Sequence, residues 1–297
     1  MISWPAPAKL NLFLHVTGQR PDGYHTLQTL FQFLDYSDEL TFAVTDNGEI
    51  SRVSEVVGVA AEDDLCVRAA RLLQTAAGIT QGVRIRLQKH LPLGGGLGGG
   101  SSDAATTLLA LNELWRLDWP LTELAALGLQ LGADIPVFIH GHAAWAEGIG
   151  EMLTPMEPAP AWYVVIVPAL AVATRRVFAA FADAVREQQL THYSPAITIR
   201  DFHAGRVRND LAPVVCRLYP EVDKALKWLS DFGATKMTGS GACVFSAVAS
   251  RDQGHAVLSA LRTKGPASYT GFVAQSLNVH PIHARRGGMM NWGVAKW

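Results

Sequence analysis

The sequence predicts an α+β fold of two domains, in which mixed or antiparallel sheets are flanked by helices. Residues 83–88 alternate strictly between apolar and polar side chains, which indicates a strand with one face in water. Apolar residues three and four positions apart indicate amphipathic helices over 64–76 and 101–115. A doubly wound parallel sheet would need strands that are apolar on both faces, so these patterns favour the α+β class.

The elements of the N-terminal half follow from the same periodicities. Residues 9–16 predict a half-buried strand, because Leu10, Leu12, Leu14 and Val16 share one face while Lys9, Asn11 and His15 share the other. After the helix over 64–76, the strand over 83–88 and the helix over 101–115, a further helix is expected over 122–131, ending at Gly132.

The C-terminal half is predicted to begin after a proline-rich seam. Pro155, Pro158 and Pro160 remove backbone donors and stiffen the chain. We therefore expect one domain over 1–157, a second over 158–283, and a loosely held tail over 284–297. The second domain should contain a strand over 163–167, helices near 175–188 and 222–232, and a strand over 243–248.

The composition is that of a globular protein with no extended charged surface. The 297 residues are 49% hydrophobic and include 25 basic and 26 acidic residues, a formal net charge of −1. Such a chain has too much apolar content for disorder, and it offers no basic field to a nucleic acid. At this length it buries about three quarters of its unfolded surface, so it needs no disulfide or metal for stability.

The same sequence gives expectations about compartment and partners. Cys66, Cys216 and Cys243 show no zinc-ligand spacing and are expected to be small core residues in a reducing compartment. The longest apolar stretch, 162–173, is shorter than the roughly 20 residues of a membrane-spanning helix, and the first residues lack a signal-peptide pattern. We expect a soluble cytoplasmic protein with a small-molecule substrate and without nucleic-acid or membrane partners; monomer and homodimer stay open.

The segment 92–103 contains six glycines in seven positions, between a predicted strand and a predicted helix. Ordering so many glycines costs more backbone entropy than any other composition, so a mere linker is a poor explanation. Without Cβ atoms, successive N–H groups can close around an anion at the start of a helix. We therefore expect this loop to bind phosphate, with Ser101 or Ser102 capping the helix that follows.

Known phosphate loops match this segment poorly. A Walker A motif would have lysine where Ser101 stands, and the protein-kinase HRD and DFG triplets are absent from the sequence. Gly94, Gly96 and Gly99 formally satisfy the dinucleotide pattern GxGxxG, but almost any glycine-rich run would do so. A dinucleotide-dependent oxidoreductase and a non-catalytic nucleotide-binding regulator are the alternatives to an enzyme that transfers phosphate.

Lys9 and Asp134 could together supply the chemistry of phosphoryl transfer to an alcohol. Such a transfer needs a carboxylate to accept the hydroxyl proton, a cation to offset charge, and Mg²⁺ on the nucleotide phosphates. A lysine beside Asp134 would favour the ionised carboxylate. The ordinary alternatives are a solvated lysine on an edge strand and an aspartate that caps a helix or forms a turn.

Three segments, 7–12, 92–103 and 238–243, resemble in order the three motifs of the GHMP kinase superfamily. Segments 20–31 and 131–138 are similar to those of one family within it, the kinases of 4-diphosphocytidyl-2-C-methyl-D-erythritol. The similarity runs from about residue 4 to residue 283. It implies a two-domain GHMP-kinase-like fold with an N-terminal ATP-binding domain. It also implies Mg²⁺-dependent transfer of the ATP γ-phosphate to the 2-hydroxyl of that substrate.

The resemblance also implies a role for particular residues. Asp134 would be the general base and Lys9 its charged partner, and residues 238–241 would pack beside the glycine loop. The nucleotide would be bound by Pro92, Leu93, Gly94, Gly95, Gly96, Leu97, Gly98, Gly99, Gly100, Ser101 and Ser102, together with Lys89 and Asp64. The substrate would be bound by Asn11 near the hydroxyl, by His25 at the cytosine edge, and by the aromatic residues Tyr24, Phe31 and Phe178.

This sequence departs from the family pattern in two places. Asp64 stands where the family usually has asparagine near the adenine, and an ionised carboxylate cannot donate a hydrogen bond. Arg175 and Arg176 stand where a proline is expected beside the cytosine. The Mg²⁺ ligands are not assigned, with Glu147 and Glu151 as nearby candidates, and Phe31 and Phe178 could alternatively be ordinary core residues.

Overall fold

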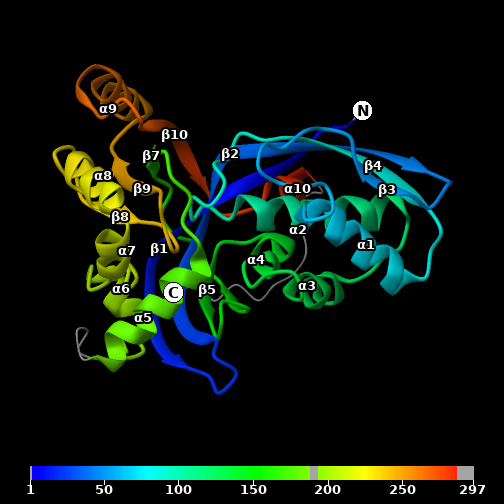
Figure 1. Ribbon diagram of the computed structural model, residues 1–297, viewed down its shortest axis with the longest axis horizontal. Coiled ribbons are helices and arrows are strands. Elements are labelled where there is room, and N and C mark those ends of the chain that lie inside the picture. The colour runs from blue at the N-terminus through cyan, green and yellow to red at the C-terminus, as the bar shows by residue number, and fades with distance from the viewer. Residues whose placement is uncertain (1, 188–192, 286–297) are drawn as a thin grey trace.

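Two long neighbouring strands form the centre of the molecule, which we describe from a computed structural model covering residues 2–187 and 193–285. In Figure 1 both strands cross the middle of the ribbon and join its two halves. The strands of the described residues are β1 (Trp4–Gln19), β2 (His25–Thr45), β3 (Ile50–Arg52), β4 (Gly82–Gln88), β5 (Ala144–Glu147), β6 (Met152–Pro155), β7 (Trp162–Val167), β8 (Thr235–Met237), β9 (Val244–Val248) and β10 (Thr270–Leu277).

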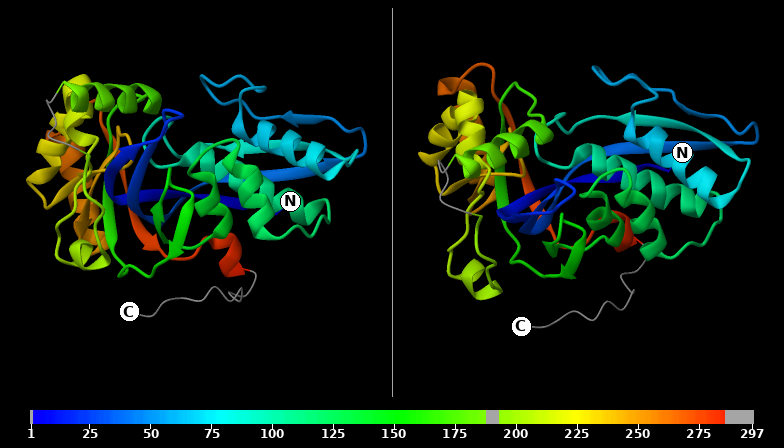
Figure 2. Two further views of the ribbon diagram at one scale, coloured as in Figure 1. Left: turned by 90° about the horizontal axis from the view of Figure 1, so that it is seen from below. Right: turned by 60° about the horizontal axis from the view of Figure 1, so that its bottom comes forward.

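The helices lie in two groups at opposite ends of these strands, as both views of Figure 2 show. The first group precedes β5, the second follows β7, and the last helix returns to the first half. The helices of the described residues are α1 (Leu65–Ala77), α2 (Gly99–Leu114), α3 (Leu121–Leu129), α4 (Ile135–His140), α5 (Thr174–Arg186), α6 (Ile199–His203), α7 (Ala212–Leu218), α8 (Pro220–Ser230), α9 (Arg251–Lys264) and α10 (Pro281–Arg285).

The described strands form one ten-stranded sheet with the order β3-β4-β2-β10-β7-β9-β8, to which β1, β5 and β6 are added beside β2. The long strand β2 pairs along its length with β1, β4, β5 and β10. The pairing of β3 with β4 is parallel and the other strand pairs are antiparallel. This mixed sheet with flanking helices confirms the predicted α+β class.

Separate apolar clusters fill the two halves. One packs α1, α2, α3 and α4 against β2 and β4, and the other packs α5, α7, α8 and α9 against β7 and β9. A third cluster between them includes Leu10, Trp145 and Phe245. The predicted seam falls between β6 and β7, and the chain crosses back where β10 pairs with β2 and Ile282 joins the first cluster. The division at residue 157 stays a prediction, and most of the predicted tail, 286–297, lies outside the described residues.

The predicted elements are present, but two local predictions were wrong. Strand β1 is buried on both faces rather than one, with Lys9, Asn11 and His15 each 3% exposed. Their side of the strand is covered because loops from both halves close over it. The helix after the glycine loop begins at Gly99 with Gly98 at the N-cap position, and no side chain caps it. Neither Ser101 nor Ser102 is therefore the cap, because the helix starts before them.

Candidate active site

The glycine loop meets β1 and the 238–243 loop at one wall of a large cavity. The backbone N–H of Lys9 donates to the Leu97 carbonyl over 2.9 Å, and that of Cys243 donates to the Gly95 carbonyl over 3.0 Å. Thr238 accepts from the Asn11 N–H at 3.0 Å. The three motifs, far apart in sequence, are thus joined by hydrogen bonds of their main chains and of the Thr238 hydroxyl. The predicted packing of residues 238–241 beside the glycine loop is confirmed, because Oγ1 of Thr238 donates to the Gly96 carbonyl over 3.2 Å.

Two glycines of the loop are required by close approach. Gly96 has φ +77°, and a Cβ there would lie 2.2 Å from the Thr238 carbonyl oxygen. Gly98 has φ +73°, and a Cβ there would lie 3.0 Å from both Cγ and Cε of Lys9. Side chains at either position would be strained in conformation and would collide with a neighbouring motif. The glycines are therefore what permits the loop, β1 and the 238–243 loop to touch.

The N-terminus of α2 opens toward the cavity without a side-chain cap. Gly98, Gly99, Gly100 and Ser101 line the cavity there. The first N–H groups of a helix have no partner within the helix and carry partial positive charge. An uncapped start lined by glycines is therefore suited to an anion.

Lys9 is a buried cation that joins two polar side chains of the cavity. Its Nζ lies 2.5 Å from Oδ1 of Asn11 and 3.2 Å from Oδ2 of Asp134. It also lies 5.2 Å from the centroid of the Phe31 ring. Asp134 is 35% exposed and stands at the N-cap position of α4 without capping it, so its carboxylate faces the cavity.

Asn11 is held on both sides of its amide. Its Nδ2 donates to Oγ1 of Thr29 over 3.0 Å, while Oδ1 accepts from Lys9. These bonds fix the orientation of the amide between Lys9 and the interior of the sheet.

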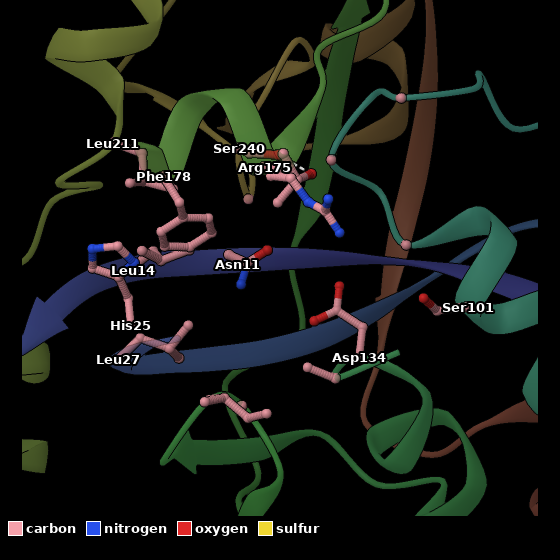
Figure 3. Close-up of a pocket in the computed structure, with 18 of the residues that line it drawn as sticks. Asn11, Leu14, His25, Leu27, Ser101, Asp134, Arg175, Phe178, Leu211 and Ser240 are labelled. Carbon is pink, nitrogen blue, oxygen red and sulfur yellow. Dashed lines mark hydrogen bonds between the residues drawn. The ribbon is translucent and has the colours of Figure 1, made fainter. Parts of the chain in front are cut away.

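Aromatic rings form the other end of the cavity. The rings of His25 and Phe178 stack with centroids 5.2 Å apart and an interplanar angle of 26°, as Figure 3 shows. Burial lowers the pKa of His25, which favours the neutral ring, and its Nε2 is buried without a hydrogen-bond partner among the described residues. Tyr24 is 61% exposed at the rim, after the turn closed by the Gly23 N–H and the Arg20 carbonyl.

The cavity between these ends is large enough for two ligands. Its volume is about 1080 Å³, whereas a site for one small molecule measures about 300–1,000 Å³. Residues of both halves line it, from β1, β2, the glycine loop, the start of α4 and the length of α5. The arrangement offers a phosphate site and an aromatic site, with a paired carboxylate between them (Figure 3).

A buried ion cluster behind the glycine loop was not anticipated from the sequence. Lys89 Nζ lies 2.6 Å from Oδ2 of both Asp38 and Asp103, and Asp38 Oδ1 accepts from the backbone N–H of His90 and Leu91. The cluster joins β2 to both ends of the loop. Burial raises the pKa of Asp103 to about 8, with Lys89 opposing the shift and Asp38 adding to it.

Models of known families match both halves of the chain. The GHMP kinases N terminal domain matches residues 64–142, and the GHMP kinases C terminal domain matches residues 193–267. Curated relatives named 4-diphosphocytidyl-2-C-methyl-D-erythritol kinase match almost the whole chain. That of Pseudomonas savastanoi pv. phaseolicola is 53% identical over 95% of this chain and 94% of its own length. The relative from Thiobacillus denitrificans is 52% identical over 95% of this chain and 97% of its own length.

The chain belongs to the 4-diphosphocytidyl-2-C-methyl-D-erythritol kinase family.

Solved structures agree with this family. A crystal structure of 4-(cytidine 5'-diphospho)-2C-methyl-D-erythritol kinase is 34% identical, covers 93% of this chain and 99% of its own, and superposes with a TM-score of 0.78. A mevalonate kinase structure, 16% identical over 94% of this chain and 100% of its own, shares the fold with a TM-score of 0.65. The chain is thus a kinase of the GHMP type, for which ATP is the phosphoryl donor. The alternative of a dinucleotide-dependent oxidoreductase has no support among these relatives.

Most of the residues predicted from the family motifs meet in the cavity. The cavity is lined by Lys9, Asn11, Tyr24, His25, Phe31, Asp134, Phe178 and residues 92–101. Three of the predicted residues do not line it: Lys89, Asp64 and Ser102. Lys89 is occupied by the ion cluster. Asp64 caps α1 by accepting from the Cys66 N–H and pairs with Arg52 at 3.2 Å. Ser102 is fully buried on the inner side of α2.

Neither glutamate considered for Mg²⁺ lines this cavity. Glu147 accepts from Nε2 of Gln28, and Glu151 accepts from the backbone N–H of Ile149. Within residues 2–187 and 193–285, no three His, Cys, Asp or Glu side chains are arranged to hold a metal ion. In the same residues no helix has the length and apolar character to cross a membrane.

Proposed function

We propose that the protein transfers the γ-phosphoryl group of ATP to the 2-hydroxyl of 4-diphosphocytidyl-2-C-methyl-D-erythritol, giving the 2-phosphate and ADP. The observation that supports this most strongly is the Lys9–Asp134 pair, at 3.2 Å. It stands between an uncapped helix start and an aromatic stack in one cavity. Relatives about 52% identical along the chain bear the name of this kinase.

The glycine loop and the start of α2 are proposed to bind the triphosphate of ATP. Residues 94–101 line the cavity with backbone and one hydroxyl, so N–H groups and the helix dipole can face the phosphate oxygens. The proposed nucleotide contacts of Lys89 and Asp64 would have to come from their backbone, because both side chains are engaged elsewhere.

The aromatic end is proposed to bind the cytosine. A flat base gains about 1–3 kcal/mol from each aromatic ring on which it stacks, and the rings of Phe178 and the exposed Tyr24 are available for stacking. The unpartnered Nε2 of His25 can hydrogen-bond the edge of the base. Phe31 lies deeper, under Lys9, and supports the reacting end rather than the base.

Asp134 is proposed to act as the general base. The 2-hydroxyl oxygen attacks the γ-phosphorus and its proton passes to the Asp134 carboxylate. The bond from the γ-phosphorus to the oxygen bridging it to the β-phosphate breaks, and ADP leaves with that electron pair. Lys9 pairs with the carboxylate and holds it in position, while Asn11 orients Lys9.

Mg²⁺ fits this cavity as a partner of the nucleotide. In kinases this ion is held mainly by phosphates and water, with one or two oxygen ligands from the protein. The Ser101 hydroxyl and the Asp134 carboxylate are among the oxygen ligands that the cavity lining offers near the phosphate end. When bound, the ion would offset the charge of the β- and γ-phosphates.

The proposal is tested by ADP release from the purified protein with a panel of alcohols. We expect turnover with the cytidylyl substrate and Mg²⁺, and at most traces with mevalonate or homoserine. Preference for either of the latter would refute it.

Asp134→Asn should lower kcat by about 10²-fold or more with unchanged unfolding, since a general base contributes about 10²–10⁴. Asp231→Asn, at the exposed end of α8, is the control. A fully active Asp134→Asn variant would show that Asp134 is not the general base. A protein that releases no ADP with any alcohol would instead favour a non-catalytic nucleotide-binding regulator.

A further inference from the structure

The first turn of α5 is held against the phosphate end of the cavity. The backbone N–H of Val172 donates to the Gly94 carbonyl over 3.2 Å, and the hydroxyls of Thr174 and Ser240 lie 2.8 Å apart. A Cβ on Gly94 would lie 3.0 Å from Cβ of Ala171. The segment before Arg175 is therefore fixed to both loops that form the phosphate wall.

The side chain of Arg175 extends from this segment into the cavity. In Figure 3 its guanidinium points from α5 toward Asp134, across the space between the glycine loop and Asn11. Its neighbour Arg176 lies over the ring of Tyr219, with 5.7 Å from its Cζ to the ring centroid, and does not line the cavity. The two adjacent arginines thus have different surroundings.

Arg175 is also the cation of the cavity lining that has no anionic partner among the described residues. The lysine and arginine residues that line the cavity are Lys9, Arg175 and Arg186. Lys9 pairs with Asp134, and Arg186 pairs with Asp183. For Arg175 the described residues provide no ion pair and no side-chain hydrogen bond. A guanidinium placed in a cavity without a protein anion has its charge available for a ligand.

We propose that Arg175 binds the γ-phosphoryl group of the nucleotide and stabilises it during transfer to the acceptor. This inference rests on the proposed function. The planar guanidinium can donate two parallel hydrogen bonds to phosphoryl oxygens. Its position between the glycine loop and Asp134 is where the transferring group passes. Lys9, which already has two partners, positions the general base. Arg175 stabilises the negative charge on the phosphoryl group in the transition state.

The test compares Arg175→Ala and Arg175→Lys with Arg176→Ala, a removal of the same charge one residue away. Arg175→Ala should lower kcat by about 10²-fold, in the range found for donors that stabilise transition-state charge. Arg175→Lys should retain an intermediate rate, because the charge remains and the paired donors are lost. Added guanidinium ion should partly restore Arg175→Ala. Arg176→Ala should stay within about twofold of the unchanged protein.

Equilibrium binding without acceptor keeps this test separate from that of the proposed function. Arg175→Ala should bind a non-hydrolysable ATP analogue about tenfold more weakly, as for loss of a hydrogen bond to a charged group, and ADP nearly unchanged. If the unchanged protein phosphorylates no alcohol, the proposed function fails and this binding difference alone decides the role of Arg175.

Three results would overturn the inference. The first is that Arg175→Ala loses the same affinity for ADP as for the ATP analogue. The second is a kcat of Arg175→Ala within twofold of that of the unchanged protein. The third is an effect of Arg175→Ala that is confined to the KM of the cytidylyl substrate. The last would place the guanidinium on the diphosphate of the acceptor. Thermal unfolding of each variant shows whether the fold is kept.

Discussion

The two ends of the cavity are built in different ways. The phosphate end is made mainly of backbone: main-chain atoms of the glycine loop contact Thr238, Lys9 and Cys243. The aromatic end is made of side chains from β2 and α5, and Tyr24 there is 61% exposed. The comparison teaches that adding an atom at the first end should disturb fold and activity together. At the second end, removing a side chain should affect substrate binding alone.

Gly96→Ala should have the largest effect. The new Cβ would lie 2.2 Å from the Thr238 carbonyl oxygen at a left-handed backbone position, so the loop must shift or strain. We expect ADP release to fall by about 10³-fold, because a small misplacement at a reacting centre already costs about 10²-fold. We also expect a lower Tm in calorimetry.

Gly23→Ala is the matched control at the aromatic end. Gly23 has φ +88°, but a Cβ there would meet nothing within 4 Å. Only the conformational cost of about 1 kcal/mol should appear. If Gly23→Ala and Gly96→Ala lose similar amounts of ADP release and Tm, the close packing around Gly96 does not distinguish the two ends of the cavity.

Phe178→Leu should have a smaller and more selective effect. The stacking ring would be lost, and about 1–3 kcal/mol per stacked base corresponds to a rise of about 5- to 100-fold in the KM of the cytidylyl substrate. The KM of ATP should hardly change. Phe232→Leu, a half-buried ring in the same C-terminal cluster but away from the cavity, controls for packing. Equal changes in both KM values would contradict a separate aromatic site.

Asp103→Asn should have the smallest effect, on stability and its pH dependence. Because burial raises the pKa of Asp103 to about 8, the folded protein keeps a proton that the unfolded chain releases near pH 4. Stability should therefore fall as the pH rises from about 4 to 8. The asparagine variant should lose this dependence and be at least as stable above pH 8 by urea unfolding.

Asp38→Asn distinguishes the roles of the two carboxylates. Asp38 accepts from Lys89 and from two backbone N–H groups at the base of the loop, so Asp38→Asn should destabilise the protein. Lower stability of Asp103→Asn than of the unchanged protein at pH 9 would show that the second carboxylate is needed in its ionised form.

The sequence predicted what is local. The alternation of β4 and the amphipathic α1 follow from neighbouring residues, and the structure confirms both elements. The glycine loop does lie between a strand and a helix, and phosphate binding there stays a prediction. The position of the helix cap failed because glycine can occupy both the cap and the first turn, so the serines were not needed there. The predicted cap lies three or four residues too late, which is more than the one or two residues by which assignments of a helix end usually differ.

Contacts between distant residues could not be predicted in the same way. Lys89 pairs with Asp38, which lies 51 positions away in the sequence. The residues around either one give no signal that predicts this pair. The polar face of β1 looked like a wet face because alternation gives the period of a strand but not what covers it. Arg175 and Arg176 are identical in type, and only the direction of the helix distinguishes the one in the cavity from the one on Tyr219.

The return of the chain to its first half has a consequence for synthesis on the ribosome. Strand β10 pairs with β2, and Ile282 of α10 completes the apolar cluster beneath α2. While residues 270–285 are still inside the exit tunnel, the first half has emerged with part of β2 unpaired and that cluster incomplete. Exposed strand edges and apolar surface make such nascent species prone to aggregation. The kinase therefore reaches its final form only after residues 270–285 have left the ribosome.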